Sequence, residues 1–147
     1  MRLTKKDNKV RAIRRGLLAL LLFMSLVQAG AKTRIMLISD PHVMGPGLLI
    51  KEGEAWENAI YYDRKLNDYS RAIYDEAIAI ALREKPDLFL ISGDLTKDGE
   101  LLSHQYVAAK LQELKAAGIQ PCVIPGIHDM GTSEALYYDG DETRKAD

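Results

Sequence analysis

The sequence predicts an α/β fold, a β-α-β-α-β unit with a mainly parallel sheet. Three short apolar runs, at residues 34–39, 87–92 and 119–124, each end in polar or turn residues. Between them, apolar side chains recur at helical spacing over residues 66–80 and 101–114. Strands that alternate with helices form parallel sheets with right-handed crossovers. The length of 147 residues, with 47% hydrophobic and 28% charged residues, fits one globular domain.

The N-terminal segment has the features of a secretory signal peptide. Seven Lys and Arg residues fall within the first 15, residues 16–27 are almost entirely apolar, and small residues follow. An uncleaved membrane anchor is the alternative, but this run of 12 residues is shorter than the ~20 that span a bilayer. We therefore expect residues 1–31 to be cleaved and residues 32–147 to be exported, to the periplasm or the outside, by the Sec or the twin-arginine route.

The charge of the exported part excludes binding to a nucleic acid backbone, and its cysteine content excludes a disulfide and a zinc–thiolate site. Residues 32–147 carry 13 basic and 20 acidic side chains, a net charge of −7. Such a chain offers no basic surface to a nucleic acid backbone. Its single cysteine, Cys122, has no second thiol for a disulfide or a zinc–thiolate site.

The three strands differ in their patterns. The first two apolar runs are continuous, which predicts strands that are buried on both faces. The third contains Pro121, which has no N–H for a neighbouring strand and so does not favour a central position.

The two helices each show one apolar stripe. Their positions are Leu66, Tyr69, Ile73, Ala77 and Ile80 in the first helix, and Leu101, His104, Ala108, Leu111 and Leu114 in the second. Gly118 marks the end of the second helix. Residues 43–62 form a long insertion before the first helix, which is either a lid beside a site or a packed surface loop with an aromatic anchor.

Acidic and imidazole side chains follow all three strands. They lie in Asp40-Pro41-His42, in Gly93-Asp94 and in Gly126-Ile127-His128-Asp129. Each motif alone is most simply a turn or a cap. Because the carboxyl ends of parallel strands meet at one edge of the sheet, their coincidence on three strands predicts a functional site. The remaining histidine, His104, is interpreted as structural.

The residue types fit a centre for divalent metal ions. Asp40 and His42 can offer an oxygen and a nitrogen to one ion, and Asp94 can bridge that ion to a second. Mixed oxygen and nitrogen ligands suit zinc, manganese or iron. Two ions roughly 3.5–4 Å apart can orient a phosphoester and generate a hydroxide nucleophile. His128 is then expected near the leaving group as a proton donor, with Asp129 fixing its ring.

These motifs resemble those of the calcineurin-like metallophosphoesterases, whose pattern runs D-x-H, G-D and G-N-H-D. The chain looks like the secreted bacterial branch of that family. The resemblance implies the first half of a four-layer αββα sandwich, two metal ions and a phosphoester as the small-molecule substrate. It also implies that Asp40 and His42 bind the first ion, that Asp94 bridges the two, and that His128 is the catalytic histidine.

The sequence departs from the family pattern in two places. Ile127 stands where the family has an asparagine that binds the second ion, and the later histidine ligands do not follow before Asp147. We therefore expect a truncated domain that contains only its N-terminal part, with one sheet face exposed and available for self-association.

Three functions fit this sequence. The first is a phosphoester hydrolase impaired by Ile127 and by the missing ligands. The second is an inactive secreted binding module or truncated gene product. A nucleotide-binding domain is the third and weakest, because no glycine-rich loop follows the first strand.

Overall fold

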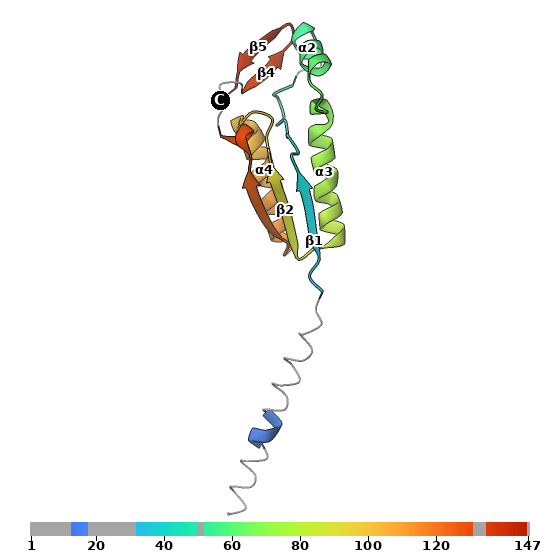
Figure 1. Cartoon of the computed structure of the whole chain (residues 1–147), viewed down its shortest axis with the longest axis vertical. Coiled ribbons are helices and arrows are strands. Elements are labelled where there is room, and N and C mark those ends of the chain that lie inside the picture. Colours follow the sequence, from blue (N-terminus) through green and yellow to red (C-terminus); the bar gives the residue numbers. More distant parts are fainter. Residues whose placement is uncertain (1–12, 18–31, 50–51, 131–134, 147) are drawn as a thin grey trace, which may run out of the picture. The chain divides into compact units, whose positions relative to one another are not determined.

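A computed structural model of the chain describes residues 13–17, 32–49, 52–130 and 135–146. The chain divides into two compact units, residues 1–33 and 34–147. In the first unit, residues 13–17 are helical, and the rest of the predicted signal peptide lies outside the described residues (Figure 1). No helix within the described ranges is long and apolar enough to cross a membrane. The signal peptide stays a prediction.

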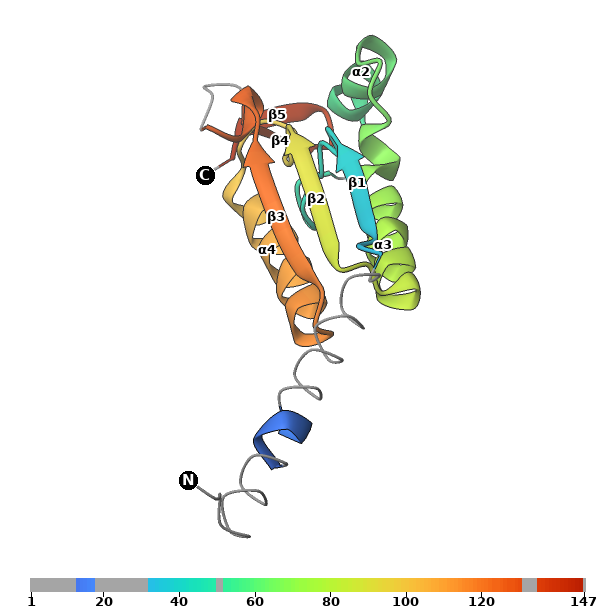
Figure 2. The same ribbon diagram turned by 60° about the horizontal axis from the view of Figure 1, so that its bottom comes forward.

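The second unit contains the predicted β-α-β-α-β order. Its elements are β1 (Ile35–Ser39), α3 (Asn67–Glu84), β2 (Leu88–Gly93), α4 (Leu101–Ala116) and β3 (Gln120–Pro125). The strands form a parallel sheet in the order β1-β2-β3. Both helices lie on the same face of this sheet, as Figure 2 shows. The predicted fold class is confirmed, and the strand bounds differ from the predicted ones by a single residue.

The main core lies between the sheet and its two helices. The middle strand β2 contributes Phe89 and Ile91, which are 0% and 1% exposed. Tyr74 and Ile78 of α3 and Leu114 of α4 pack with them in one cluster of buried side chains. Because the central strand is covered by both helices, it fixes the position of the polar loop that follows it.

The predicted buried stripe of α3 is wrong by one position. Tyr69 and Ile73 are 56% and 53% exposed, whereas Tyr74 and Ile78 are 1% and 2% exposed. A second stripe with the same helical spacing carries the contacts, and it begins with a polar residue, Ser70. The Ser70 hydroxyl accepts a hydrogen bond from the backbone N–H of Met44 and donates one to the carbonyl of Asn67. This buried polar residue hides the true stripe in the sequence.

In α4 the predicted stripe is confirmed at Leu114, which is 0% exposed, but is wrong at its start. Leu101, on the predicted stripe, is 51% exposed, while Ser103 and Val107 are 0% and 4% exposed. Ser103 is satisfied inside the protein because its hydroxyl donates to Glu100 and accepts from the backbone N–H of Gly45. The helix therefore packs through a face that contains Leu114 of the predicted stripe together with the buried Ser103 and Val107.

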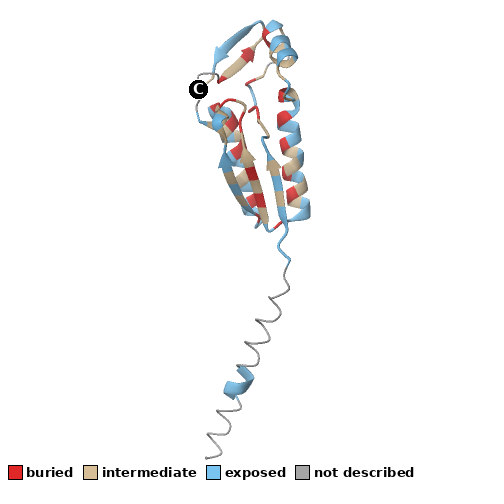
Figure 3. Ribbon diagram, in the orientation of Figure 1, coloured by how far each residue is buried: buried red, intermediate tan, exposed pale blue. Residues whose placement is uncertain are grey.

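The sheet is covered on one face only in the described part of the chain. Ile35, Leu37 and Ile124 are 57%, 62% and 69% exposed, and exposure alternates along β1 and β3 (Figure 3). The expectation that the first two strands are buried on both faces is therefore wrong here, and an apolar sheet face is exposed as expected. Cys122 lies on this face and is exposed.

Pro121 lies in β3, which pairs only with β2 in this sheet. A proline is tolerated at such an edge because its missing N–H leaves no bond unmade on the outer side.

The insertion after β1 is packed where the structure describes it. Met44 and Leu48 are 3% and 2% exposed and form a second cluster with Ala55 of α2 (Glu54–Tyr62). Trp56, the aromatic residue expected to anchor the loop, is only partly buried. The described segment is therefore held by aliphatic side chains, and its second part is the helix α2, which the sequence did not predict.

A short antiparallel hairpin completes the second cluster. Its strands are β4 (Leu136–Asp139) and β5 (Glu142–Lys145), and Tyr138 packs on Met44 and Leu48. The sequence did not predict this hairpin, because all four side chains of β5 are polar or charged.

Paired alanine substitutions in α3 test which of its stripes is buried. Ile78→Ala should lower the free energy of unfolding by about 2–5 kcal/mol, the range for large buried side chains. The matched Ile73→Ala, at a half-exposed position, should cost less than about 1 kcal/mol. Urea denaturation of both variants measures the difference. Equal losses would contradict the assigned packing face.

Candidate metal centre

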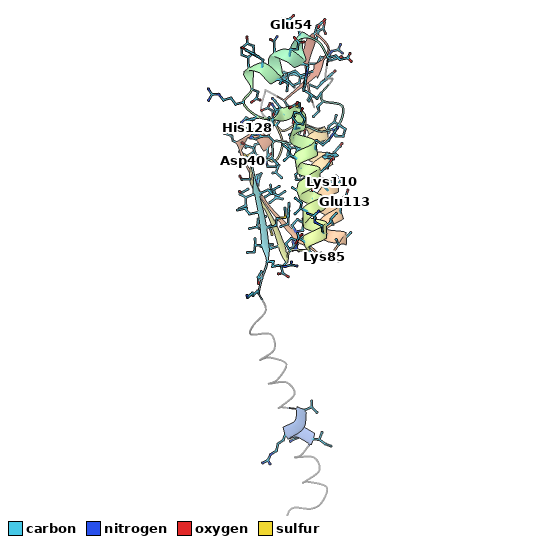
Figure 4. The ribbon with its side chains drawn as sticks, turned by 90° about the vertical axis from the view of Figure 1, so that its right-hand side faces the viewer. Asp40, Glu54, Lys85, Lys110, Glu113 and His128 are labelled. Atoms are coloured by element: carbon cyan, nitrogen blue, oxygen red, sulfur yellow. The ribbon has the colours of Figure 1, made fainter. Side chains whose placement is uncertain are left out.

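The candidate site lies where the three parallel strands end. Asp40 and His42 follow β1, and Asp94 follows β2. Beyond β3, residues Ile127–Asp129 form one turn of 3-10 helix. Figure 4 shows Asp40 and His128 at the same end of the sheet. The site is thus built from loops that are far apart in the sequence and adjacent in the fold.

Asp40, His42 and Asp94 form a cluster with the geometry of a metal site. Each offers one ligand atom, and these atoms all lie within 4.8 Å of one another. The Nε2 atom of His42 is 3.7 Å from Oδ2 of Asp94. Two carboxylates and one imidazole are a donor set that suits zinc, manganese or iron. The structure brings together the three residues that the sequence indicated, and their role as ligands stays a prediction.

The backbone is strained where the first two residues of the cluster leave β1. Asp40 and His42 have φ angles of 47° and 42°, in the left-handed region. Such conformations cost on the order of 1–3 kcal/mol each and persist where the surroundings impose them. Here the backbone N–H of Asp40 donates to the carbonyl oxygen of Ser92 at 2.9 Å. The backbone N–H of His42 donates to the carbonyl oxygen of Asp94 at 3.1 Å. Pairing with the neighbouring loop therefore holds the strained turn in place.

Two glycines leave room for the carboxylates. A Cβ atom at Gly93 would overlap the carboxylate of Asp40, and one at Gly126 would overlap the carboxylate and backbone of Asp94. Gly93 also has a φ of 82°, which other residues rarely adopt. These glycines belong to the G-D and G-x-H-D motifs, so the motifs have a steric reason as well as a chemical one.

The surroundings of His42 favour its neutral form. Burial lowers the pKa of His42 below its usual value, and the nearby ammonium of Lys65 lowers it further, against the opposite effect of Asp94. A neutral imidazole has the free lone pair that metal binding requires. At neutral pH the ring is therefore ready to act as a ligand.

His128 is oriented by a carboxylate that sequence reasoning missed. Its Nδ1 atom lies 2.7 Å from Oδ1 of Asp98, whose side chain is 6% exposed. The His128 ring meets that of His42 edge to face, with the centroids 5.4 Å apart. Asp98 also pairs with the ammonium of Lys97. The only sequence feature that could have indicated Asp98 is its position four residues after Asp94, in the same loop.

The expected contact of Asp129 with the His128 ring is wrong. The Asp129 carboxylate instead accepts hydrogen bonds from the backbone N–H groups of Leu95, Thr96 and Gly126, at 3.0, 2.8 and 2.9 Å, and from the Thr96 hydroxyl at 2.7 Å. Burial alone would raise the pKa of Asp129, but these bonds outweigh it and lower the pKa. Asp129 therefore links the turn after β3 to the loop after β2. The His128 ring is oriented by Asp98 and not, as expected, by Asp129.

Two further residues complete the turn. The Nε2 atom of His104 lies 3.2 Å from the carbonyl oxygen of Asp129, which agrees with a structural role for this histidine. Ile127 is 72% exposed on the same turn, and its alkyl side chain has no atom that can bind a metal ion. The position where a second-metal ligand was expected is thus accessible but chemically inert.

Comparison with known sequences agrees with this geometry. The sequence model of the calcineurin-like phosphoesterase family matches residues 33–147. No curated protein matches the chain. The family match spans well over half of the chain and includes every residue of the metal cluster. The chain therefore belongs to the calcineurin-like phosphoesterase family.

Proposed function

We propose that the protein is a metal-dependent phosphoester hydrolase. The observation that carries this proposal is that ligand atoms of Asp40, His42 and Asp94 lie within 4.8 Å of one another, in a chain that belongs to the calcineurin-like phosphoesterase family. The adjacent pair of His128 and Asp98 supports it, since hydrolysis of a phosphoester needs a group that can protonate the departing oxygen.

Each residue has a distinct part in the proposed reaction. A divalent ion bound at the cluster would polarise the phosphoester and activate water. Asp40 and Asp94 hold fixed positions for this ion, because the Asp94 N–H donates to Asp40 and the His128 N–H donates to Asp94. Asp98 accepts a hydrogen bond from the Nδ1–H of His128, so a His128 ring that is protonated on both nitrogens could give its Nε2 proton to the leaving group and become neutral.

We further propose that the protein binds one ion more strongly than two. Among residues 32–49, 52–130 and 135–146, the structure holds a single cluster of three candidate ligands. The side chain of Ile127 adds none. Activity in this form is then low, and a catalytically inactive binding module is the alternative that the exposed Ile127 favours.

Export and self-association are parts of the same proposal. The basic and apolar N-terminal segment supports export, and the exposed apolar sheet face with Leu37 and Ile124 supports association of copies. The N-terminal residue of the recovered protein tests the first, and its sedimentation coefficient over a range of concentrations tests the second.

Asp94→Asn tests the metal site directly. The substitution removes one carboxylate charge from the cluster, so we expect it to abolish Mn²⁺ binding and the slow cleavage of an activated aryl phosphate ester. Asp87→Asn is the matched control, because Asp87 lies at the opposite end of β2 and accepts a hydrogen bond only from backbone in the contacts described. Calorimetry and a spectrophotometric assay measure the two effects. Absence of Mn²⁺ binding to the folded, unsubstituted protein would refute the proposal.

Ile127→Asn separates the hydrolase from the binding module. An amide at this exposed position supplies an oxygen that isoleucine lacks, so turnover of the aryl ester should rise at least about tenfold, which corresponds to about 1.4 kcal/mol of barrier. Ile127→Ala controls for removal of the apolar side chain and should leave turnover unchanged. If both variants stay at background in the presence of Mn²⁺, the inactive binding module is the better account.

A further inference from the structure

Lys65 lies beside the metal cluster, in the loop between α2 and α3. Its ammonium nitrogen is 3.4 Å from Nδ1 of His42, and the contact is partly buried. Nothing in the described part of the chain forms a salt bridge with this ammonium. The loop itself is fixed, because Asp63 accepts hydrogen bonds from the backbone N–H of Lys65 and from the side chain of Asn67, at 2.9 and 2.6 Å.

Metal binding must remove the acceptor that Lys65 now uses. An ammonium only donates hydrogen bonds, and a neutral imidazole has one nitrogen that accepts and one that donates. When His42 gives its lone pair to an ion, the other ring nitrogen carries the proton. Whichever nitrogen binds the ion, Lys65 has no acceptor left on His42. When the site holds a metal ion, the Lys65 ammonium must therefore donate its hydrogen bonds to an acceptor other than His42.

A pocket of about 310 Å³ adjoins this ammonium. Asp40, His42 and Lys65 are among the residues that line it, and so are the polar side chains of Ser39, Asn67 and Ser70. Much of the remaining wall is apolar and comes from Ile38, Leu66, Ile73 and Ala77. A ligand that enters the pocket can therefore reach the metal cluster with a charged group while its carbon skeleton contacts apolar side chains.

We propose that Lys65 and this pocket form the substrate subsite, and that the substrate is a phosphate ester with a small apolar organic group. This inference rests on the proposed function. Lys65 donates a charge-assisted hydrogen bond to a phosphate oxygen, and the apolar wall holds the organic group. An aryl or short alkyl group fits this wall better than a sugar, whose hydroxyls would lose their hydrogen bonds to water there.

Equilibrium binding to the Mn²⁺-loaded protein tests the role of Lys65. The probes are inorganic phosphate and phenylphosphonate, which is not hydrolysed, and calorimetry measures both affinities. Lys65→Met should weaken both probes about tenfold, the size of one charge-assisted hydrogen bond. Lys115→Met, at an exposed site in the last turn of α4, is the control and should change neither. Lys65→Arg keeps a cationic donor and should retain most of the phosphate affinity.

A second substitution tests the apolar wall. Phenylphosphonate should bind more tightly than phosphate to the unsubstituted protein. Ala77→Leu reduces the room in the pocket without touching a charged group, so it should remove this preference and leave phosphate binding unchanged. If Lys65→Met binds phosphate as well as the unsubstituted protein does, or if the preference for the phenyl group is absent or survives Ala77→Leu, the subsite is refuted.

The same samples separate this inference from the proposed function. Failure of the unsubstituted protein to bind Mn²⁺ refutes both. Normal Mn²⁺ binding and ester cleavage, together with unchanged phosphate affinity in Lys65→Met, refute the subsite alone.

Discussion

Ser39 pairs with Ser92, and Ser92 pairs with Ile124, so the three parallel strands end side by side. Everything at the candidate metal centre depends on this register. The residues that carry the chemistry come immediately after these ends, and a slip of one residue would turn each strand's side chains to the opposite face. The core beneath β2 stabilises this register. The strained turn at Asp40 and His42, which follows β1, then places both side chains near Asp94.

Of the polar groups around the site, some face the reactive side chains and others fix the backbone that carries them. Asp129 accepts four hydrogen bonds from two loops and so fixes the turn that carries His128. Asp98 faces the ring itself and is nearly buried. Ile127 is the exception, since it lies exposed on this well-supported turn without a polar atom. The turn around Ile127 is well supported, so the missing polar atom at this position comes from the residue type and not from the backbone.

The sequence predicts the strand ends and the metal cluster because each depends on local signals: apolar runs, the glycines that follow them, and acids and histidines at fixed spacing. The helix faces are different. Two adjacent stripes of α3 share one period, and the buried one includes Ser70, whose partner lies in a distant loop. Asp98 orients the His128 ring in place of Asp129, because a sequence shows neighbours along the chain and not which N–H groups a carboxylate faces. The hairpin of β4 and β5 packs through the buried Tyr138, and no pattern in the polar strand β5 reveals this contact.

Asp40, His42 and Asp94 are proposed to bind one divalent ion together. Anomalous diffraction from crystals grown with Zn²⁺ tests it most directly, because the method locates the ion independently of any activity. We expect one strong peak within about 2.2 Å of a ligand atom from each of the three residues. A folded protein in which this position shows no peak at saturating Zn²⁺, or in which the ion binds only at other residues, would contradict it.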